Sequence, residues 1–231
     1  MNTKNTSNAA TMRRMARLTG LLYFIFAALG IYTIMYIQPR IIVSNDAAAT
    51  ARNMLAQESL FRLGKAAGVV TSFLFILIVL LLYRLLRGVN DHQARLMVAL
   101  VVVCIPVAIS SDALEITALS IFKGNALTVF DAGQSQSLAM ALIKISGNMT
   151  QMLTVFWGVW LFPLGLLVYR SGFIPRVLGI LLIANGLGYV IHCFTFLLFP
   201  QQLSLVLKFV FPLYFMGEVP FIFWLMIKGV R

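Results

Sequence analysis

Six segments of the chain are each long and apolar enough to cross the hydrocarbon core of a bilayer, which takes about 20 residues at about 1.5 Å each. The membrane interior offers no water to peptide groups, so a crossing segment must satisfy its backbone internally as a helix. We therefore expect an all-α fold, a polytopic membrane helical bundle with six transmembrane helices. The expected spans are residues 18–37, 64–83, 96–116, 149–169, 174–198 and 205–227.

The composition excludes an ordinary soluble domain. Apolar residues make up 61% of the 231 residues, against roughly 45–50% in soluble domains. Charged residues make up 11%, against about 25%. The continuous apolar runs also argue against a membrane β-barrel, because barrel strands are short and alternate between lipid-facing and lumen-facing residues.

The 18 Lys and Arg residues predict the orientation, because cytoplasmic loops of membrane proteins are enriched in both. Most of them lie in residues 1–17, in the short loops after the second and fourth spans, and at the C-terminus. We therefore expect a cytoplasmic tail at 1–17 and a single six-helix domain at 18–231, with both termini in the cytoplasm. The external segments are then 38–63 and 117–148.

The net charge of +11 does not predict nucleic-acid binding, because the basic residues form short clusters between apolar runs without a nucleic-acid motif. The expected partner is the bilayer, with anionic phospholipids at the cytoplasmic face. The oligomeric state is left open. We expect no cofactor or metal, since Cys104 and Cys193 lie in apolar runs and His92 lies far along the chain from His192.

The first external segment contains a helix signal. Residues 44–46, Ser-Asn-Asp, offer side-chain oxygens that cap a helix start. Residues 47–61 then have the pattern of a short helix that lies along the outer membrane surface. Its apolar face comprises Ala51, Met54, Leu55 and Phe61.

The spans also carry packing signals. Small residues four apart permit close helix contact, and they occur at Gly64 and Gly68 and at Ala184 and Gly188. Proline within a span is expected to kink the helix. The prolines concerned are Pro106, Pro163, Pro212 and Pro220.

Four stretches together resemble a known family. They are Asp-Ala-Ala-Ala-Thr at 46–50, Phe-Arg-Leu-Gly at 61–64, the run 163–189 with Arg-Ser-Gly-Phe-Ile-Pro at its centre, and 217–229 beginning with Gly-Glu. In order and spacing they resemble the bacterial multi-pass membrane proteins that share domain of unknown function 4386, over about residues 17–231. The resemblance implies a protein of the bacterial inner (plasma) membrane and assigns no catalytic residue. Family members tend to carry Asp where this chain has His192, so a role for that carboxylate does not transfer.

Glu218 is the main candidate for a functional residue, because an ionisable side chain at the middle of a span costs at least about 2.5–3.5 kcal/mol. It lies roughly 15 Å from the cytoplasmic end of the sixth span at the helical rise. Pro220 lacks a backbone donor, which leaves the carbonyl of Met216 available beside the carboxyl group. One interpretation is a site for an ion, a proton or a polar ligand. The other is a protonated Glu that hydrogen-bonds to a neighbouring helix.

Asn185 and His192 share one face of the fifth span and extend a polar stripe along it. His192 either faces Glu218 or meets head groups near the outer end of its helix. These three residues form the candidate intramembrane site.

Asp112 and Glu115 are three residues apart and share a helical face near the outer end of the third span. Such a pair is typical of acid–base chemistry or cation binding. Salt bridges are the simpler interpretation, because three cations are predicted on the same side of the membrane. They are Arg62, Lys65 and Lys144.

These observations favour a non-enzymatic protein that binds or moves a small solute, ion or lipid through a cavity between helices. Two alternatives stay open. One is an intramembrane lipid-modifying enzyme that uses Asp112, Glu115 and His192, and the other is a structural or regulatory subunit of a membrane complex. The sequence contains no dinucleotide-binding, P-loop, zinc-protease or serine-hydrolase motif. No catalytic residue is assigned.

Overall fold

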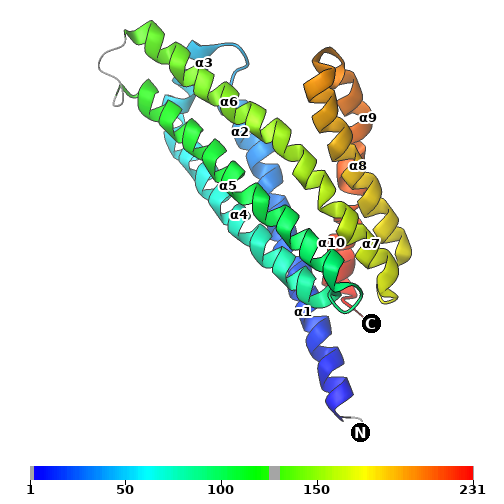
Figure 1. The fold of residues 1–231 in the computed structure, drawn as a ribbon. Coiled ribbons are helices and arrows are strands. Elements are labelled where there is room, and N and C mark those ends of the chain that lie inside the picture. Colours follow the sequence, from blue (N-terminus) through cyan, green and yellow to red (C-terminus); the bar gives the residue numbers. More distant parts are fainter. Residues whose placement is uncertain (1–2, 125–130, 231) are drawn as a thin grey trace. The chain divides into compact units, whose positions relative to one another are not determined.

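The computed structural model describes residues 3–124 and 131–230, and every regular element within these residues is a helix (Figure 1). Six helical segments are long and apolar enough to cross a membrane. The prediction of an all-α fold with six such helices is confirmed, and the chain is a multi-pass membrane protein. Residues 125–130 of the predicted external segment, and Arg231 at the C-terminus, lie outside the described residues.

The elements follow one another in this order: α1 (Thr3–Tyr32), the π-helix η1 (Thr33–Ile37), α2 (Gln38–Ile41), α3 (Ala47–Ala56), α4 (Glu58–Leu86), α5 (Asp91–Phe122), α6 (Ala132–Val159), α7 (Leu161–Ser171), α8 (Arg176–Leu198), the 3-10 helix η2 (Pro200–Gln202), α9 (Leu203–Met216) and α10 (Glu218–Ile227).

Several helices extend beyond the predicted spans, because polar side chains support helix ends that lie outside the apolar runs. At the start of α5, the Asn90 side chain accepts a hydrogen bond of 3.0 Å from the backbone N–H of Gln93. The apolar pattern of a span does not predict such a cap, so the predicted span is shorter than the helix. The helix α1 likewise begins at Thr3, within the segment that was predicted as a tail.

Two helix breaks interrupt the fourth and sixth segments, and each lies three residues before a proline. The chain passes from α6 to α7 at Trp160 and from α9 to α10 at Gly217. Pro163 and Pro220 lack the N–H that would bond to the carbonyl four residues earlier, so the helical ladder fails at these points. The other two span prolines lie inside continuous helices.

The chain divides into two compact units, each with its own buried core. Unit 1 comprises Met1–Phe26, Leu74–Cys104 and Met152–Arg231, and unit 2 comprises Ala27–Phe73 and Ile105–Gln151. The division therefore falls within the four long helices α1, α4, α5 and α6.

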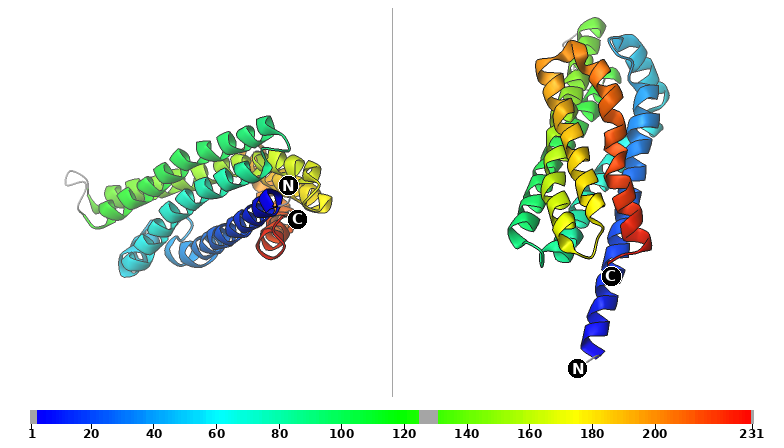
Figure 2. Two further views of the ribbon diagram at one scale, coloured as in Figure 1. Left: turned by 90° about the horizontal axis from the view of Figure 1, so that it is seen from below. Right: turned by 90° about the vertical axis from the view of Figure 1, so that its right-hand side faces the viewer.

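Unit 1 contains close helix contacts at glycine. A Cβ on Gly158 of α6 would lie 2.5 Å from the carbonyl oxygen of Gly186 of α8, and a Cβ on Gly165 of α7 would lie 2.7 Å from that of Gly179. Helices α7, α8 and α9 run side by side (Figures 1 and 2). Glycine is what permits the backbones of α6, α7 and α8 to approach so closely. The largest fully buried side chains of this unit include Trp160, Tyr23, Phe221, Leu82, Leu86, Met97 and Leu164.

Unit 2 has an apolar core to which η1, α2, α3, α4, α5 and α6 all contribute. Its buried members are Ile37, Ile41, Met54, Phe61, Ala118, Leu119, Ile121, Ala139, Met140 and Ile143. The short segment between α2 and α3 is closed by Thr50, whose hydroxyl donates to the Val43 carbonyl (3.1 Å) and accepts from the Val43 N–H (3.0 Å).

The helix predicted over residues 47–61 is two elements in the structure, since α3 ends at Ala56 and α4 begins at Glu58. The predicted cap is present, because Asp46 Oδ1 accepts a hydrogen bond of 2.8 Å from the Ala49 N–H. Ala51, Met54 and Phe61 are buried, but Leu55 is 42% exposed. Leu55 lies about 100° around the helix from its buried neighbour at 54, which turns it off the apolar face. The place of α3 on a membrane surface stays a prediction.

Candidate functional site

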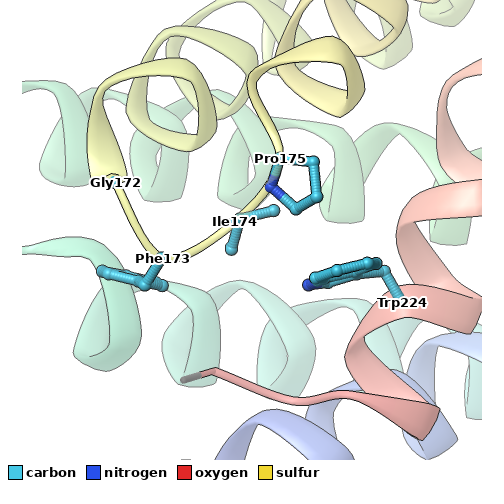
Figure 3. A pocket seen from close by; sticks show the side chains of 5 residues that line it. All are labelled: Gly172, Phe173, Ile174, Pro175 and Trp224. Carbon is cyan, nitrogen blue, oxygen red and sulfur yellow. The ribbon is translucent and has the colours of Figure 1, made fainter.

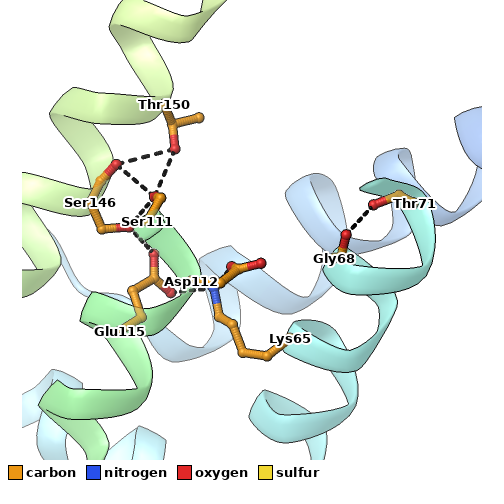
Figure 4. Close-up of polar contacts among 8 residues, drawn as sticks. All are labelled: Lys65, Gly68, Thr71, Ser111, Asp112, Glu115, Ser146 and Thr150. Carbon is orange, nitrogen blue, oxygen red and sulfur yellow. Dashed lines mark hydrogen bonds and ion pairs between the residues drawn. The ribbon is translucent and has the colours of Figure 1, made fainter. Parts of the chain in front are cut away.

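A network of charged and hydroxyl side chains joins α4, α5 and α6 within unit 2 (Figure 4). The ammonium of Lys65 on α4 lies 2.9 Å from Asp112 Oδ1 and 2.5 Å from Glu115 Oε2, both on α5. The three-residue spacing presents both carboxylates on the same helical face. Of the three cations that the sequence offered, Lys65 is the one that pairs with them.

A hydroxyl group is a second direct partner of the buried Glu115 carboxylate. Ser146 of α6 donates a hydrogen bond of 2.6 Å to Glu115 Oε1, and the Ser111 hydroxyl lies 2.7 Å from that of Ser146. Thr150 extends the line, at 3.5 Å from Ser111. Glu115 is only 5% exposed and Ser146 is fully buried. A buried carboxylate needs such partners, because an unpaired one would pay its full loss of hydration.

The cluster of Lys65, Asp112 and Glu115 carries one negative charge in excess when all three groups are ionised, because two carboxylates face one ammonium. Gly68 of α4 is part of the reason that Asp112 fits so close. A Cβ at position 68 would lie 2.6 Å from Asp112 Oδ2. The two carboxylates therefore lie close to Lys65, and the single ammonium does not balance both of their charges.

The other two predicted cations lie elsewhere in unit 2. Arg62 pairs with Glu58 at 2.8 Å, and Glu58 also pairs with Lys123 at 3.0 Å. Lys144 is exposed, and among residues 3–124 and 131–230 its ammonium forms no ion pair. Neither Arg62 nor Lys144 therefore neutralises Asp112 or Glu115.

A groove of about 480 Å³ adjoins this network, and both Glu115 and Lys144 line it. Its remaining lining comes from η1, α2, the segment after α2, and α6. Polar groups are contributed by Gln38, Ser44 and Asn45, and apolar side chains by Ile34, Pro39, Ile42, Met140 and Ile143. The groove lies within the range of about 300–1,000 Å³ that is usual for small-molecule sites. It thus combines one acidic group, one basic group and an apolar surface.

Unit 1 holds a second polar group of residues, centred on Glu218, the first residue of α10. The Tyr23 hydroxyl of α1 donates a hydrogen bond to Glu218 Oε1. The backbone N–H of Glu218 donates to Asn185 Oδ1 of α8 at 3.3 Å. Asn185 is fully buried, and its Nδ2 has no hydrogen-bond partner among the described residues. The sequence-predicted pair of Asn185 and Glu218 is therefore in contact.

His192 bonds to a different residue. Its Nδ1 lies 2.7 Å from the hydroxyl of Tyr214 on α9, and Tyr214 stacks on Tyr189 of α8 with ring centroids 4.2 Å apart. Of the two interpretations of His192, the structure shows no hydrogen bond to Glu218 among the described residues, and the place of His192 near head groups stays a prediction. The enzymatic hypothesis joined His192 with Asp112 and Glu115. The imidazole belongs to unit 1 and the two carboxylates to unit 2, and each has its own hydrogen-bond partners there.

Six residues of these networks are not among the sequence predictions, namely three tyrosines together with Ser111, Ser146 and Thr150. Tyr23, Tyr189 and Tyr214 were counted with the apolar residues of their spans, although Tyr189 lies four residues after Asn185 and three before His192. That spacing places it on the same helical face and was a usable signal. Ser111 likewise lies four residues before Glu115.

A smaller cavity of about 270 Å³ lies in unit 1, between the α7–α8 loop and α10 (Figure 3). Gly172, Phe173, Ile174 and Pro175 line one side and Trp224 lines the other. The lining is partly polar, and the buried Nε1 of Trp224 has no hydrogen-bond partner among the described residues. Separately, no group of three or more His, Cys, Asp or Glu within the described ranges 3–124 and 131–230 is arranged to hold a metal ion.

Fold and groove together define the class of the protein, a six-helix multi-pass membrane protein with a charged, partly apolar groove. A family model described as "Domain of unknown function (DUF4386)" matches residues 18–229, and the chain belongs to this family. The resemblance noted in its sequence is thereby confirmed.

One relative is a protein of Archaeoglobus fulgidus described as "Uncharacterized protein", which is 40% identical over 76 residues. The match includes 32% of this chain and 43% of that protein, so the chain covers less than half of the relative's length. No solved structure matches the chain.

Proposed function

We propose that the protein binds a zwitterionic lipid, with a primary ammonium and a phosphate in its head group, in the groove of unit 2. The ammonium bonds to Glu115, the phosphate bonds to Lys144, and the adjoining part of an acyl chain lies on the apolar lining. The single observation that carries the proposal is that one groove is lined by a carboxylate and by an ammonium without an ion pair.

The charges of unit 2 support a cationic group beside Glu115. The carboxylate has about four lone-pair positions, and Lys65 and Ser146 account for two of them. The cluster also carries one excess negative charge. A ligand ammonium adds a charge-assisted hydrogen bond and balances that charge.

The other lining residues support an anionic group and a hydrocarbon part. Lys144 is a point charge with three donors and no carboxylate partner in the described part of the chain, and lysine is a frequent phosphate ligand. Ile34, Ile42 and Met140 supply apolar contact in the same groove. A free amino acid would satisfy the two charges but not this surface.

Titration of the purified full chain by native mass spectrometry tests the proposal. Phosphatidylethanolamine should bind at least about tenfold more tightly than phosphatidylglycerol with the same acyl chains, because a hydrogen bond to a charged group is worth about 1.5–3 kcal/mol. Phosphoethanolamine without acyl chains separates head-group recognition from lipid binding. Equal affinity for the two lipids contradicts the proposal.

Matched variants localise the binding. Glu115→Gln and Lys144→Gln should each weaken binding of phosphatidylethanolamine by about tenfold, for the same reason. Glu58→Gln and Lys208→Gln remove the same charges from residues that do not line the groove, and should leave the affinity unchanged. Affinities that fall equally in all four variants would point to general electrostatics rather than to this groove.

The proposed setting is the bacterial inner membrane, with both termini in the cytoplasm. The basic tail and the basic loops after the second and fourth spans support it, because Lys and Arg are enriched in cytoplasmic loops. Two reporters fused to the C-terminus test this orientation. A reporter that functions only in the cytoplasm should be active, and an enzyme that functions only in the periplasm should be inactive. Activity of the periplasmic enzyme would contradict the orientation.

A further inference from the structure

The break between α9 and α10 places a glutamate at the first residue of α10, within an apolar segment. Glu218 begins α10, directly after the break at Gly217. In a continuous helix, residue 220 would donate to the carbonyl of Met216, but Pro220 has no N–H. This carbonyl therefore lies two residues from Glu218 without its helical donor, inside an apolar segment that extends from Pro200 to Ile227.

The partners of the Glu218 carboxyl group are neutral. Tyr23 of α1 donates its hydroxyl to it, and Asn185 of α8 contacts the same residue through the backbone N–H. Tyr189 of α8, four residues after Asn185, stacks on Tyr214 of α9. No Lys, Arg or His in the described part of the chain forms an ion pair with Glu218.

A carboxylate in an apolar span without a cation is costly, and it is usually relieved by a proton or by a bound cation. The neighbouring group favours a proton over a metal ion. The Tyr23 O–H donates to the carboxyl group, and Asn185 uses its Oδ1 for the Glu218 backbone N–H. Donors stabilise a carboxylate but repel a metal ion, which needs several oxygen ligands.

We infer that Glu218 is a reversible proton-binding site, in which the Tyr23 hydroxyl donates to the carboxyl group and Asn185 positions the residue through its backbone N–H. No bond other than O–H forms or breaks, and the proton is exchanged with water. This inference is independent of the lipid groove, because it uses residues of unit 1 alone.

Infrared difference spectroscopy of the full chain in liposomes tests the inference. A carbonyl band of a protonated carboxylic acid should gain intensity on acidification and lose it on alkalinisation. Glu218→Gln should remove this band, whereas Glu115→Gln should leave it in place. If the Gln variant fails to fold, Glu218→Asp retains a titratable group and should shift the band in frequency without abolishing its response to pH.

Three results would overturn the inference. One is a Glu218 band that stays constant at every pH, and another is the absence of such a band at every pH. The third is loss of the band on adding sodium chloride but not choline chloride at fixed pH, which would identify a metal-cation site. A structural hydrogen bond alone would give the first of these. Tyr23→Phe tests whether the band belongs to the carboxyl group that Tyr23 contacts. Loss of this hydrogen bond should move the carbonyl band to higher frequency.

Discussion

The two units solve the same physical problem in different ways. Each places a glutamate inside an apolar helical segment, where a bare charge is costly. In unit 2, Glu115 has the ammonium of Lys65 and the hydroxyl of Ser146 as direct partners. In unit 1, the direct partner of the Glu218 carboxyl group is the neutral Tyr23 hydroxyl, and no residue that the structure describes forms an ion pair with it. An ion-paired carboxylate must keep its charge to stabilise the fold, whereas one with neutral partners is free to change its protonation state.

Removal of the cation from unit 2 should have the largest effect. Lys65→Met leaves two carboxylates without a counter-ion, and breaking a buried ion pair costs about 3–5 kcal/mol. We expect a large fall in the thermal unfolding temperature of the detergent-solubilised protein. Adding Asp112→Asn and Glu115→Gln to this variant should recover much of the loss, since no charge is then left unpaired. Lys208→Met, at an exposed position, is the control and should be neutral.

The hydroxyl partner of Glu115 should matter less than the cation. Ser146→Ala removes a buried donor to a charged group, which is worth about 1.5–3 kcal/mol. The exposed Ser137, which bonds to a backbone carbonyl, provides the matched change. Unfolding by a denaturing detergent should separate Ser146→Ala from Ser137→Ala. Equal stability of the two variants would show that Glu115 does not depend on the hydroxyl.

The contact of α6 with α8 in unit 1 should be sensitive to added volume at Gly158. Gly158→Ala places a methyl group 2.5 Å from the backbone oxygen of Gly186, and overpacking of this kind costs about 1–3 kcal/mol. Gly30→Ala meets nothing within 4 Å and should be neutral or stabilising by up to about 1 kcal/mol. Thermal unfolding checks both, and a stable Gly158→Ala protein would contradict the close contact of α6 with α8.

The smallest effect should come from Glu218→Gln. The amide oxygen can still accept the hydrogen bond from Tyr23, and the substitution breaks no ion pair. We therefore expect the free energy of unfolding to change by about 1 kcal/mol or less. Glu115→Gln takes a partner from Lys65 and should lose clearly more stability in the same assay. If Glu218→Gln were the more destabilising of the two, the proposed contrast between the units would be wrong.

The six spans could be predicted from the sequence because lipid exposure demands long apolar runs, and that demand is local. The helix breaks could not. The sequence predicted kinks at four prolines and did not distinguish the two that follow breaks, Pro163 and Pro220, from Pro106 and Pro212, which lie inside continuous helices. A missing N–H weakens the ladder at each proline, and packing decides whether the helix breaks there.

The candidate sites show the same limit. The spacing of Asp112 and Glu115 predicted a shared face, but the choice of Lys65 over Arg62 and Lys144 depends on how α4 packs against α5. Tyr23 lies 195 residues from Glu218 in the sequence, so no local pattern connects them. Tyr23 was also counted as an apolar residue of its span, although a buried tyrosine hydroxyl usually has a polar partner.

An experimental structure of the protein in nanodiscs of phosphatidylethanolamine tests the lipid-binding proposal most directly. It should show a head group in the groove of unit 2, with its ammonium within about 3 Å of the Glu115 carboxylate and its phosphate beside Lys144. A groove closed by side chains, or occupied by an acyl chain with the head group elsewhere, would contradict the proposal.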